Sequence, residues 1–107
     1  MSAITVIRLT GELEIGRKDE ISRALRLTGS ERSILVDFHD VTYADSTSLA
    51  ELLRFRRDAD AHGIPVAIVI GSRQFARLIQ YAGLSDAFTV FEDRGAALTY
   101  LSASQTS

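Results

Sequence analysis

The sequence contains no cysteine, a single proline and no long uninterrupted apolar run. Without cysteine the chain cannot form disulfides, use a thiol nucleophile or bind a metal through thiolates. Its longest apolar run, 66–70, is far shorter than the ~20 residues of a membrane-spanning helix, and its N-terminus lacks the basic start and apolar core of a signal peptide. We therefore expect a cytoplasmic protein that is not inserted in a membrane.

Net charge is also small. The formal value is -2 over 107 residues, whereas nucleic-acid-binding proteins usually carry a strongly basic face. This balance argues against a nucleic-acid partner. The length fits one domain with one hydrophobic core, and 46% of the residues are hydrophobic. We expect a single domain over residues 1–101, followed by a short, polar and frayed tail at 102–107.

The spacing of apolar residues predicts an alternation of strands and helices. Short runs rich in apolar and β-branched residues predict strands, and apolar residues at i, i+3, i+4 and i+7 predict helices. Alternation at 12–15 also predicts that the first strand continues after a turn as a hairpin. The predicted strands are 3–9, 34–38, 66–70 and 88–91, and the predicted helices are 17–28, 48–61, 73–82 and 94–101.

This order of elements predicts an α/β fold. Strands that alternate with helices form a mostly parallel sheet through right-handed crossovers. We expect four to five strands and about four helices, with the first hairpin adding an antiparallel edge. Functional sites in such sheets gather at the carboxyl ends of the strands.

The segment 39–48 follows the strand 34–38 and leads into the next helix, so it lies at such a strand end. It contains a carboxylate followed by three hydroxyls. One interpretation is helix capping, in which Ser48 and Glu51 form a capping box, or Asp45 or Ser46 serves as the cap.

The second interpretation of the same segment is a phosphorylation switch. A helix N-terminus has free amides and the positive end of the helix dipole, so a phosphoester is tolerated there. Phosphate adds about -1.5 to -2 charges, which changes a partner's affinity without changing the fold. Capping alone does not need three adjacent hydroxyls.

Several segments resemble one family in their order and spacing. They are Ile-Arg-Leu-Thr-Gly-Glu-Leu (7–13), Ile-Leu-Val-Asp-Phe (34–38), Asp-Ser-Thr-Ser-Leu-Ala-Glu-Leu-Leu (45–53), Gly-Ile-Pro-Val-Ala-Ile-Val (63–69) and Leu-Ile-Gln-Tyr-Ala-Gly-Leu-Ser-Asp-Ala-Phe (78–88). Together they look like a STAS domain, in the style of bacterial anti-sigma factor antagonists. The resemblance covers about residues 4–101 and implies the fold expected above.

The resemblance also implies partner switching. An anti-sigma factor with serine/threonine kinase activity phosphorylates the antagonist, a serine/threonine phosphatase reverses the modification, and only the unphosphorylated form captures the anti-sigma factor. Asp45 and Ser46 match the first two residues of the family motif, Thr47 matches its phosphoacceptor and Leu49 its leucine. Ser48 departs from the pattern, because the family usually has glycine there.

Thr47 is therefore the expected phosphoacceptor, with Ser46 and Ser48 as alternatives. On the following helix, Glu51 and Arg54 are spaced as an i, i+3 ion pair, which indicates either a solvated face or part of a recognition surface. The expected partner-binding residues are Asp45, Ser46, Thr47, Ser48, Glu51 and Arg54.

Other chemistry has little support in the sequence. Asp37 ends a strand as the phosphorylated carboxylate of receiver domains does, but no acidic pair follows the first strand, and Lys18 is the only lysine. His39 and His62 have no metal-ligand spacing, and neither a phosphate-binding glycine loop nor a nucleophile elbow is present. We expect no enzyme activity, cofactor or metal. The alternatives are an unphosphorylated STAS adaptor subunit of a lipid-transport complex and a stressosome-like scaffold.

Overall fold

The computed structural model describes residues 4–105. Within them no helix is long and apolar enough to cross a membrane. The elements in chain order are β1 (Ile4–Arg8), β2 (Gly11–Leu13), the 3-10 helix η1 (Ile15–Arg17), α1 (Lys18–Ala24), β3 (Ser33–Phe38), β4 (Val41–Ala44), α2 (Ser46–Ala61), β5 (Val66–Ile70), α3 (Arg73–Tyr81), β6 (Thr89–Phe91) and α4 (Arg94–Gln105).

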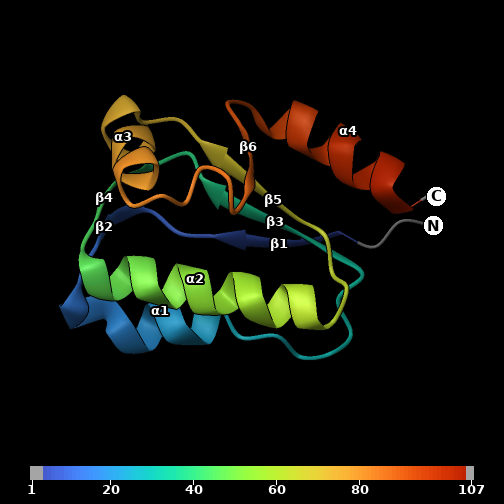
Figure 1. Ribbon diagram of the computed structural model, residues 1–107, viewed down its shortest axis with the longest axis horizontal. Coiled ribbons are helices and arrows are strands. Elements are labelled where there is room, and N and C mark those ends of the chain that lie inside the picture. Colours follow the sequence, from blue (N-terminus) through green and yellow to red (C-terminus); the bar gives the residue numbers. More distant parts are fainter. Residues whose placement is uncertain (1–3, 106–107) are drawn as a thin grey trace.

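The main sheet has four strands in the order β1-β3-β5-β6, and every pair is parallel. The apolar run of β3 occupies the interior of this sheet and is buried along its whole length. Strands β2 and β4 form a separate two-stranded parallel sheet at one end of the molecule (Figure 1). The expected α/β architecture with a mostly parallel sheet is confirmed.

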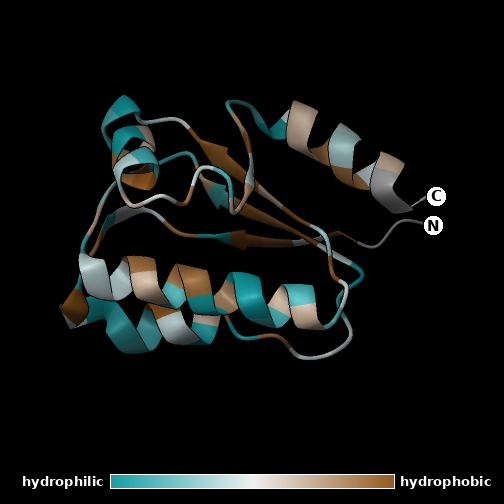
Figure 2. Ribbon diagram, viewed as in Figure 1, coloured by the Kyte–Doolittle hydropathy of each residue, from teal (hydrophilic) through white to brown (hydrophobic). Residues whose placement is uncertain are grey.

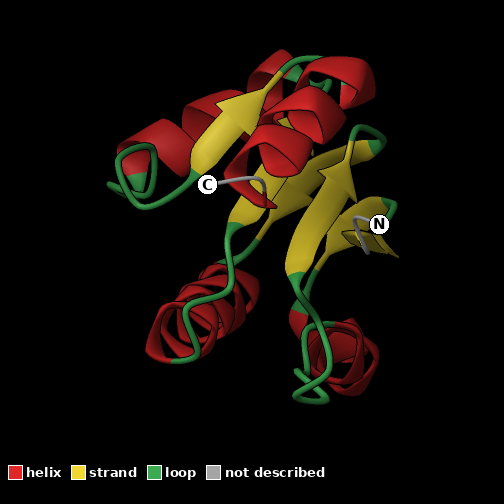
Figure 3. Cartoon of the chain, turned by 90° about the vertical axis from the view of Figure 1, so that its right-hand side faces the viewer, coloured by secondary structure: helices red, strands yellow, loops and turns green. Residues whose placement is uncertain are grey.

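Alternation along the strands divides the core between the two faces of the main sheet. Ile34, Val36 and Phe38 of β3 belong to a large buried cluster shared with α1, α2 and α3. Leu35 faces the other way and belongs to a small cluster covered by α4. In Figures 1 and 3, α1 and α2 lie on one side of the strands and α4 on the other. The strands are accordingly the most hydrophobic part of the ribbon in Figure 2.

The predicted antiparallel hairpin is wrong. β1 pairs with β3 rather than with the segment that follows it, and β2 pairs in parallel with β4. The chain turns at Gly11, whose φ of 78° is in the left-handed region that favours glycine. Arg17 then holds the turn, donating hydrogen bonds to the carbonyl oxygens of Thr10 at 2.7 Å and Glu12 at 2.9 Å. The strand β4 differs from the loop that the sequence predicts over residues 39–48.

Several helix boundaries also differ from the prediction. α1 ends four residues before Thr28, where the Glu31 carboxylate accepts hydrogen bonds from the amides of Thr28 and Gly29 and closes a turn instead. α4 continues to Gln105, so residues 102–105 are helical rather than frayed. Ala3, placed in the first predicted strand, and residues 106–107 of the predicted tail lie outside the described residues.

Candidate functional site

Asp45 joins two segments at the carboxyl end of the sheet. Its carboxylate caps α2 by accepting a hydrogen bond from the Ser48 amide at 2.9 Å, and its second oxygen accepts one from the Ile15 amide at 2.8 Å. Its own amide donates to the carbonyl oxygen of Leu13 at 2.9 Å. The start of α2 is therefore fastened to the segment between β2 and η1.

These hydrogen bonds also fix the charge of the site. The Ser48 amide, followed by the Ser48 hydroxyl and the amides of Ile15 and Thr47, holds the pKa of the Asp45 carboxyl below its usual range, because each of these donors favours the ionised form. Asp45 is consequently an anion at neutral pH, in the position next to the hydroxyls.

The proposed capping box at Ser48 is wrong. Asp45 is the cap, one of the two alternatives weighed for it, and α2 begins at Ser46. Ser48 lies in the first turn with only 4% of its surface exposed, and Glu51 bonds to Arg54 instead of reaching back. The reason is helical periodicity: Ser48 continues the buried stripe formed by Leu52, Phe55 and Ala59.

The three hydroxyls of the first turn have different environments. Ser46 is exposed, Thr47 is half-buried and Ser48 is buried. A modifying enzyme therefore reaches the hydroxyls of Ser46 and Thr47 more readily than that of Ser48. Asp45, Ser46 and Thr47 form one continuous surface at the helix start.

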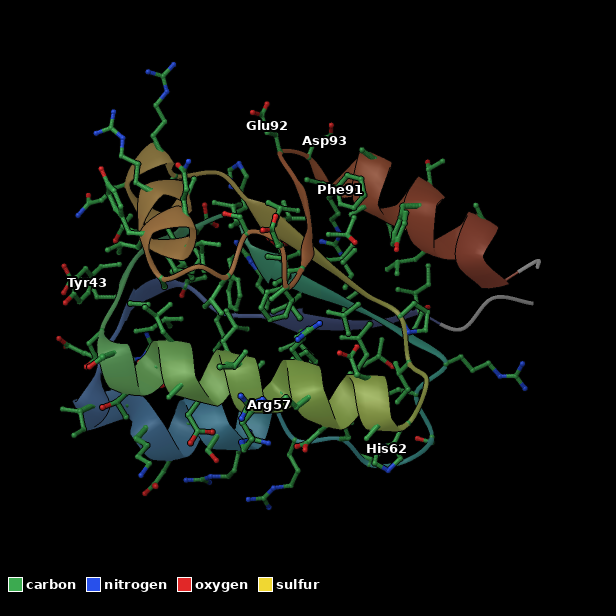
Figure 4. The ribbon with its side chains drawn as sticks, in the orientation of Figure 1. Tyr43, Arg57, His62, Phe91, Glu92 and Asp93 are labelled. Carbon is green, nitrogen blue, oxygen red and sulfur yellow. The ribbon has the colours of Figure 1, made fainter. Side chains whose placement is uncertain are left out.

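Two large apolar side chains next to this surface were missed as functional candidates. Ile15, expected at an inward strand position, is 68% exposed in η1, and its amide is the one bonded to Asp45. Tyr43 is 38% exposed on β4, two residues before Asp45, and Figure 4 shows it projecting outward at the end of the molecule where α2 begins. Exposed aromatic and aliphatic side chains in one place are typical of protein interfaces. The sequence signal for Tyr43 was its position just before the polar motif, whereas none indicated Ile15.

Glu51 and Arg54 lie further along α2 and are paired with each other. Arg54 donates to Glu51 at 3.0 Å and to Asp58 at 2.8 Å, and its guanidinium also approaches the Leu25 carbonyl oxygen at 3.5 Å. The predicted i, i+3 pair is confirmed. These contacts give both side chains a structural role within the chain, and their part in partner binding remains a prediction.

The remaining polar candidates have local roles. The buried Asp37 carboxylate accepts a hydrogen bond from the His39 amide at 3.0 Å and faces Arg94 of α4 at 3.8 Å, which confirms the interpretation of a strand-end aspartate bonded to backbone. The His62 ring lies 2.8 Å from the Asp58 carbonyl oxygen at the end of α2. Among residues 4–105 no group of three histidine or acidic side chains is placed to hold a metal ion.

A four-stranded parallel sheet with helices on both faces, and a capped, hydroxyl-rich helix start at its carboxyl edge, define a small α/β domain built around one exposed helix terminus. The family model described as the STAS domain matches residues 2–97. The chain belongs to the STAS domain family. Comparison with curated proteins gives no match.

Similar solved structures come from more than one kind of protein. A sulfate transporter family protein from Wolinella succinogenes matches with a TM-score of 0.87 at 16% identity, covering 100% of this chain and 93% of that one. A candidate anti-sigma factor antagonist from Thermotoga maritima matches with a TM-score of 0.79 at 19% identity, covering 90% and 86%. The Bacillus cell-fate determinant SpoIIAA in its phosphorylated form matches with a TM-score of 0.60 at 23% identity, covering 90% and 89%. At these identities the likeness concerns the fold.

Proposed function

We propose that this chain is a partner-switching regulator of the anti-sigma factor antagonist type. In its unphosphorylated form it binds an anti-sigma factor that is a serine/threonine kinase, and phosphorylation of Thr47 releases that partner. The observation that carries the proposal is the first turn of α2, where Ser46 and Thr47 are accessible beside the exposed Ile15 and Tyr43. Structural similarity to SpoIIAA in both its unphosphorylated and phosphorylated forms supports it.

The chemistry is a balanced phosphoryl transfer. The Thr47 hydroxyl oxygen forms a bond to the γ-phosphorus of ATP, the bond from that phosphorus to ADP breaks, and the hydroxyl proton passes to a base of the kinase. A phosphatase directs water onto the phosphoester and restores the hydroxyl. This chain supplies the acceptor and the recognition surface, and it has no catalytic role in the cycle.

Electrostatics explain how the modification acts. The Asp45 carboxylate already occupies the Ser48 amide, so a phosphate on Thr47 lies beside an anion that uses one of the free donors of the helix start. The negative charge of this end rises by about 1.5 to 2 units. A partner that packs against Ile15 and Tyr43 must then desolvate that charge or dissociate.

Intact-mass measurement after incubation with ATP and the cognate kinase tests the proposal. We expect the chain to gain one phosphate, Thr47→Ala to gain none, and Thr42→Ala, a matched change of an exposed threonine on β4, to behave like the wild type. We also expect Thr47→Glu to weaken kinase binding by roughly tenfold or more, equivalent to ~1.4 kcal/mol. Absence of phosphate from Ser46, Thr47 and Ser48 alike would contradict the switch.

A second candidate function is supported by the sulfate transporter family structure, whose TM-score of 0.87 exceeds those of the antagonists. In this alternative the chain is an unphosphorylated adaptor subunit of a transport complex or a scaffold. The same surface of α2 would then bind a transporter subunit, Thr47→Ala would bind as well as the wild type, and ATP with a kinase would leave the mass unchanged.

A further inference from the structure

Among the helices of residues 4–105, α3 is the one that carries two exposed arginines and no acidic residue. Arg73, Arg77 and Tyr81 recur at intervals of four residues, which places them in one row along the helix. All three are exposed, Tyr81 by 85%. With Gln74 and Leu78 they line a shallow hollow of 560 Å³. We call this row of Arg73, Arg77 and Tyr81, with Leu78, the α3 row.

The two arginines of the α3 row have no carboxylate partner within the described residues. α3 contains no aspartate or glutamate, and neither arginine is within ion-pair distance of one elsewhere in residues 4–105. On α2, by contrast, Arg54 and Arg56 are paired with acidic residues of their own helix. Like charges four residues apart on a helix are mildly destabilising, so the row is not explained by the stability of the helix.

The position of α3 links this charge to the proposed switch. α3 packs against β4, the strand that carries Tyr43 and leads directly into Asp45 and the start of α2. Figure 1 shows α3, β4 and the first turn of α2 gathered at the same end of the molecule. Helix α3 and the first turn of α2 therefore lie at the same end of the molecule, both next to β4.

We infer that the α3 row is a docking site for an acidic face of the protein partner, in which carboxylates pair with Arg73 and Arg77 while apolar groups contact Tyr81 and Leu78. Arginine and tyrosine are, with tryptophan, the side chains enriched where protein interfaces concentrate their binding energy. Two arginines next to an apolar contact surface match a protein better than the continuous basic stripe that nucleic acids require. The inference rests on the proposed function, because it names the chemistry of the partner that the phosphate on Thr47 would repel.

The test uses the full chain and a helical peptide with pairs of glutamates four residues apart around leucine, with a glutamine version as its control. In low salt we expect the glutamate peptide to change the amide chemical shifts of residues 73–81 and their neighbours only. The glutamine peptide should change none of them. Arg73→Glu/Arg77→Glu should weaken binding at least tenfold. Arg26→Glu/Arg32→Glu, which changes the charge equally at two exposed arginines without ion pairs, should leave it unchanged. Raising the salt to 1 M, where the screening length is about 3 Å, should abolish it.

Other outcomes separate this inference from its rivals. Tighter binding of phosphatidylserine vesicles or of a DNA duplex through Arg73 and Arg77 would overturn the assignment to a protein partner, as would shifts that ignore residues 73–81. If Thr47 accepts phosphate while Arg73→Glu/Arg77→Glu binds the kinase normally, the docking site is wrong and the switch stands. If the peptide binds the α3 row but no kinase modifies Thr47, the switch is wrong and the acidic docking site stands.

Discussion

Helices α2 and α3 both lie against β4, but they balance their charges in opposite ways. On α2, Arg54 bonds to Glu51 and Asp58, and Arg56 bonds to Asp60, so two of its three arginines are paired within the helix. On α3, Arg73 and Arg77 have no such partners. Arg54 of α2 therefore has a role in the fold, whereas the unpaired arginines of α3 are the basis of the proposed docking site. The first turn of α2, with its accessible hydroxyls, belongs to the proposed functional surface.

The inward faces of α2 and α3 should contribute about equally to the free energy of unfolding. Substitutions on these faces should have the largest effects. Phe55 of α2 and Phe75 of α3 are both fully buried, and the Phe75 ring packs edge-on against Phe38 with centroids 5.5 Å apart. We expect Phe55→Ala and Phe75→Ala each to lower the free energy of unfolding by about 3–5 kcal/mol, measured by urea denaturation. Replacing either phenylalanine by leucine should retain most of the free energy of unfolding. A loss below about 1 kcal/mol at Phe75 alone would mean that α3 is only loosely anchored.

The caps of the two helices should differ in their response to pH. Asp45 accepts two hydrogen bonds as an anion, while Ser72 accepts one from the Phe75 amide at 3.3 Å as a neutral group. Ser72→Ala should cost about 1 kcal/mol, and Asp45→Asn should also lower the free energy of unfolding at neutral pH, because it removes the charge that accepts both hydrogen bonds. Because the pKa of Asp45 is lowered by folding, its contribution is complete at neutral pH and is lost as the pH falls through the folded-state pKa.

Urea midpoints of the wild type, Asp45→Asn and Ser72→Ala between pH 7 and pH 2 measure this difference. The gap between wild type and Asp45→Asn should close as the pH falls below the usual aspartate pKa of 3.8. The gap for Ser72→Ala, which does not titrate, should stay constant. A constant gap for Asp45→Asn would show that the carboxylate charge is irrelevant to the cap.

The inner strands β3 and β5 of the main sheet could be predicted from sequence, because they are buried on both faces and appear as short apolar runs. The small sheet could not. β4 has two buried and two exposed residues, and its partner β2 is distant in sequence, since the paired residues Gly11 and Val41 are 30 positions apart. No local pattern distinguishes such a pair from a loop, and a turn between adjacent strand-like segments favoured a hairpin.

Prediction of the candidate site was limited in the same way. Asp45, Ser46 and Thr47 were found because their residue types mark a helix start. The burial of Ser48 could have been predicted by extending the stripe of Leu52 and Phe55 back by one turn. The exposure of Ile15 could not, because it depends on the turn that η1 makes after β2, which is fixed by hydrogen bonds from Arg17 and to Asp45.

The smallest expected effects come from arginine substitutions on the charged faces of α2 and α3. They compare these two faces directly. Arg54→Ala removes two ion pairs at i, i+3 and i, i+4 and should lower the free energy of unfolding by about 0.5–1 kcal/mol, since exposed helical pairs contribute ~0.3–0.5 kcal/mol each. Arg77→Ala removes no ion pair and relieves repulsion from Arg73, so stability should be unchanged or rise by about 0.3 kcal/mol.

Repeating both measurements in 1 M salt distinguishes charge from packing, because screening at that ionic strength suppresses exposed ion pairs. The loss of stability from Arg54→Ala should then decrease to the part that the aliphatic portion of the arginine side chain contributes by packing on the helix surface. The small gain in stability from Arg77→Ala should disappear. An equal loss from both substitutions in low salt would mean that Arg77 has a stabilising partner within the chain, and Arg77 would then be as engaged in the fold as Arg54.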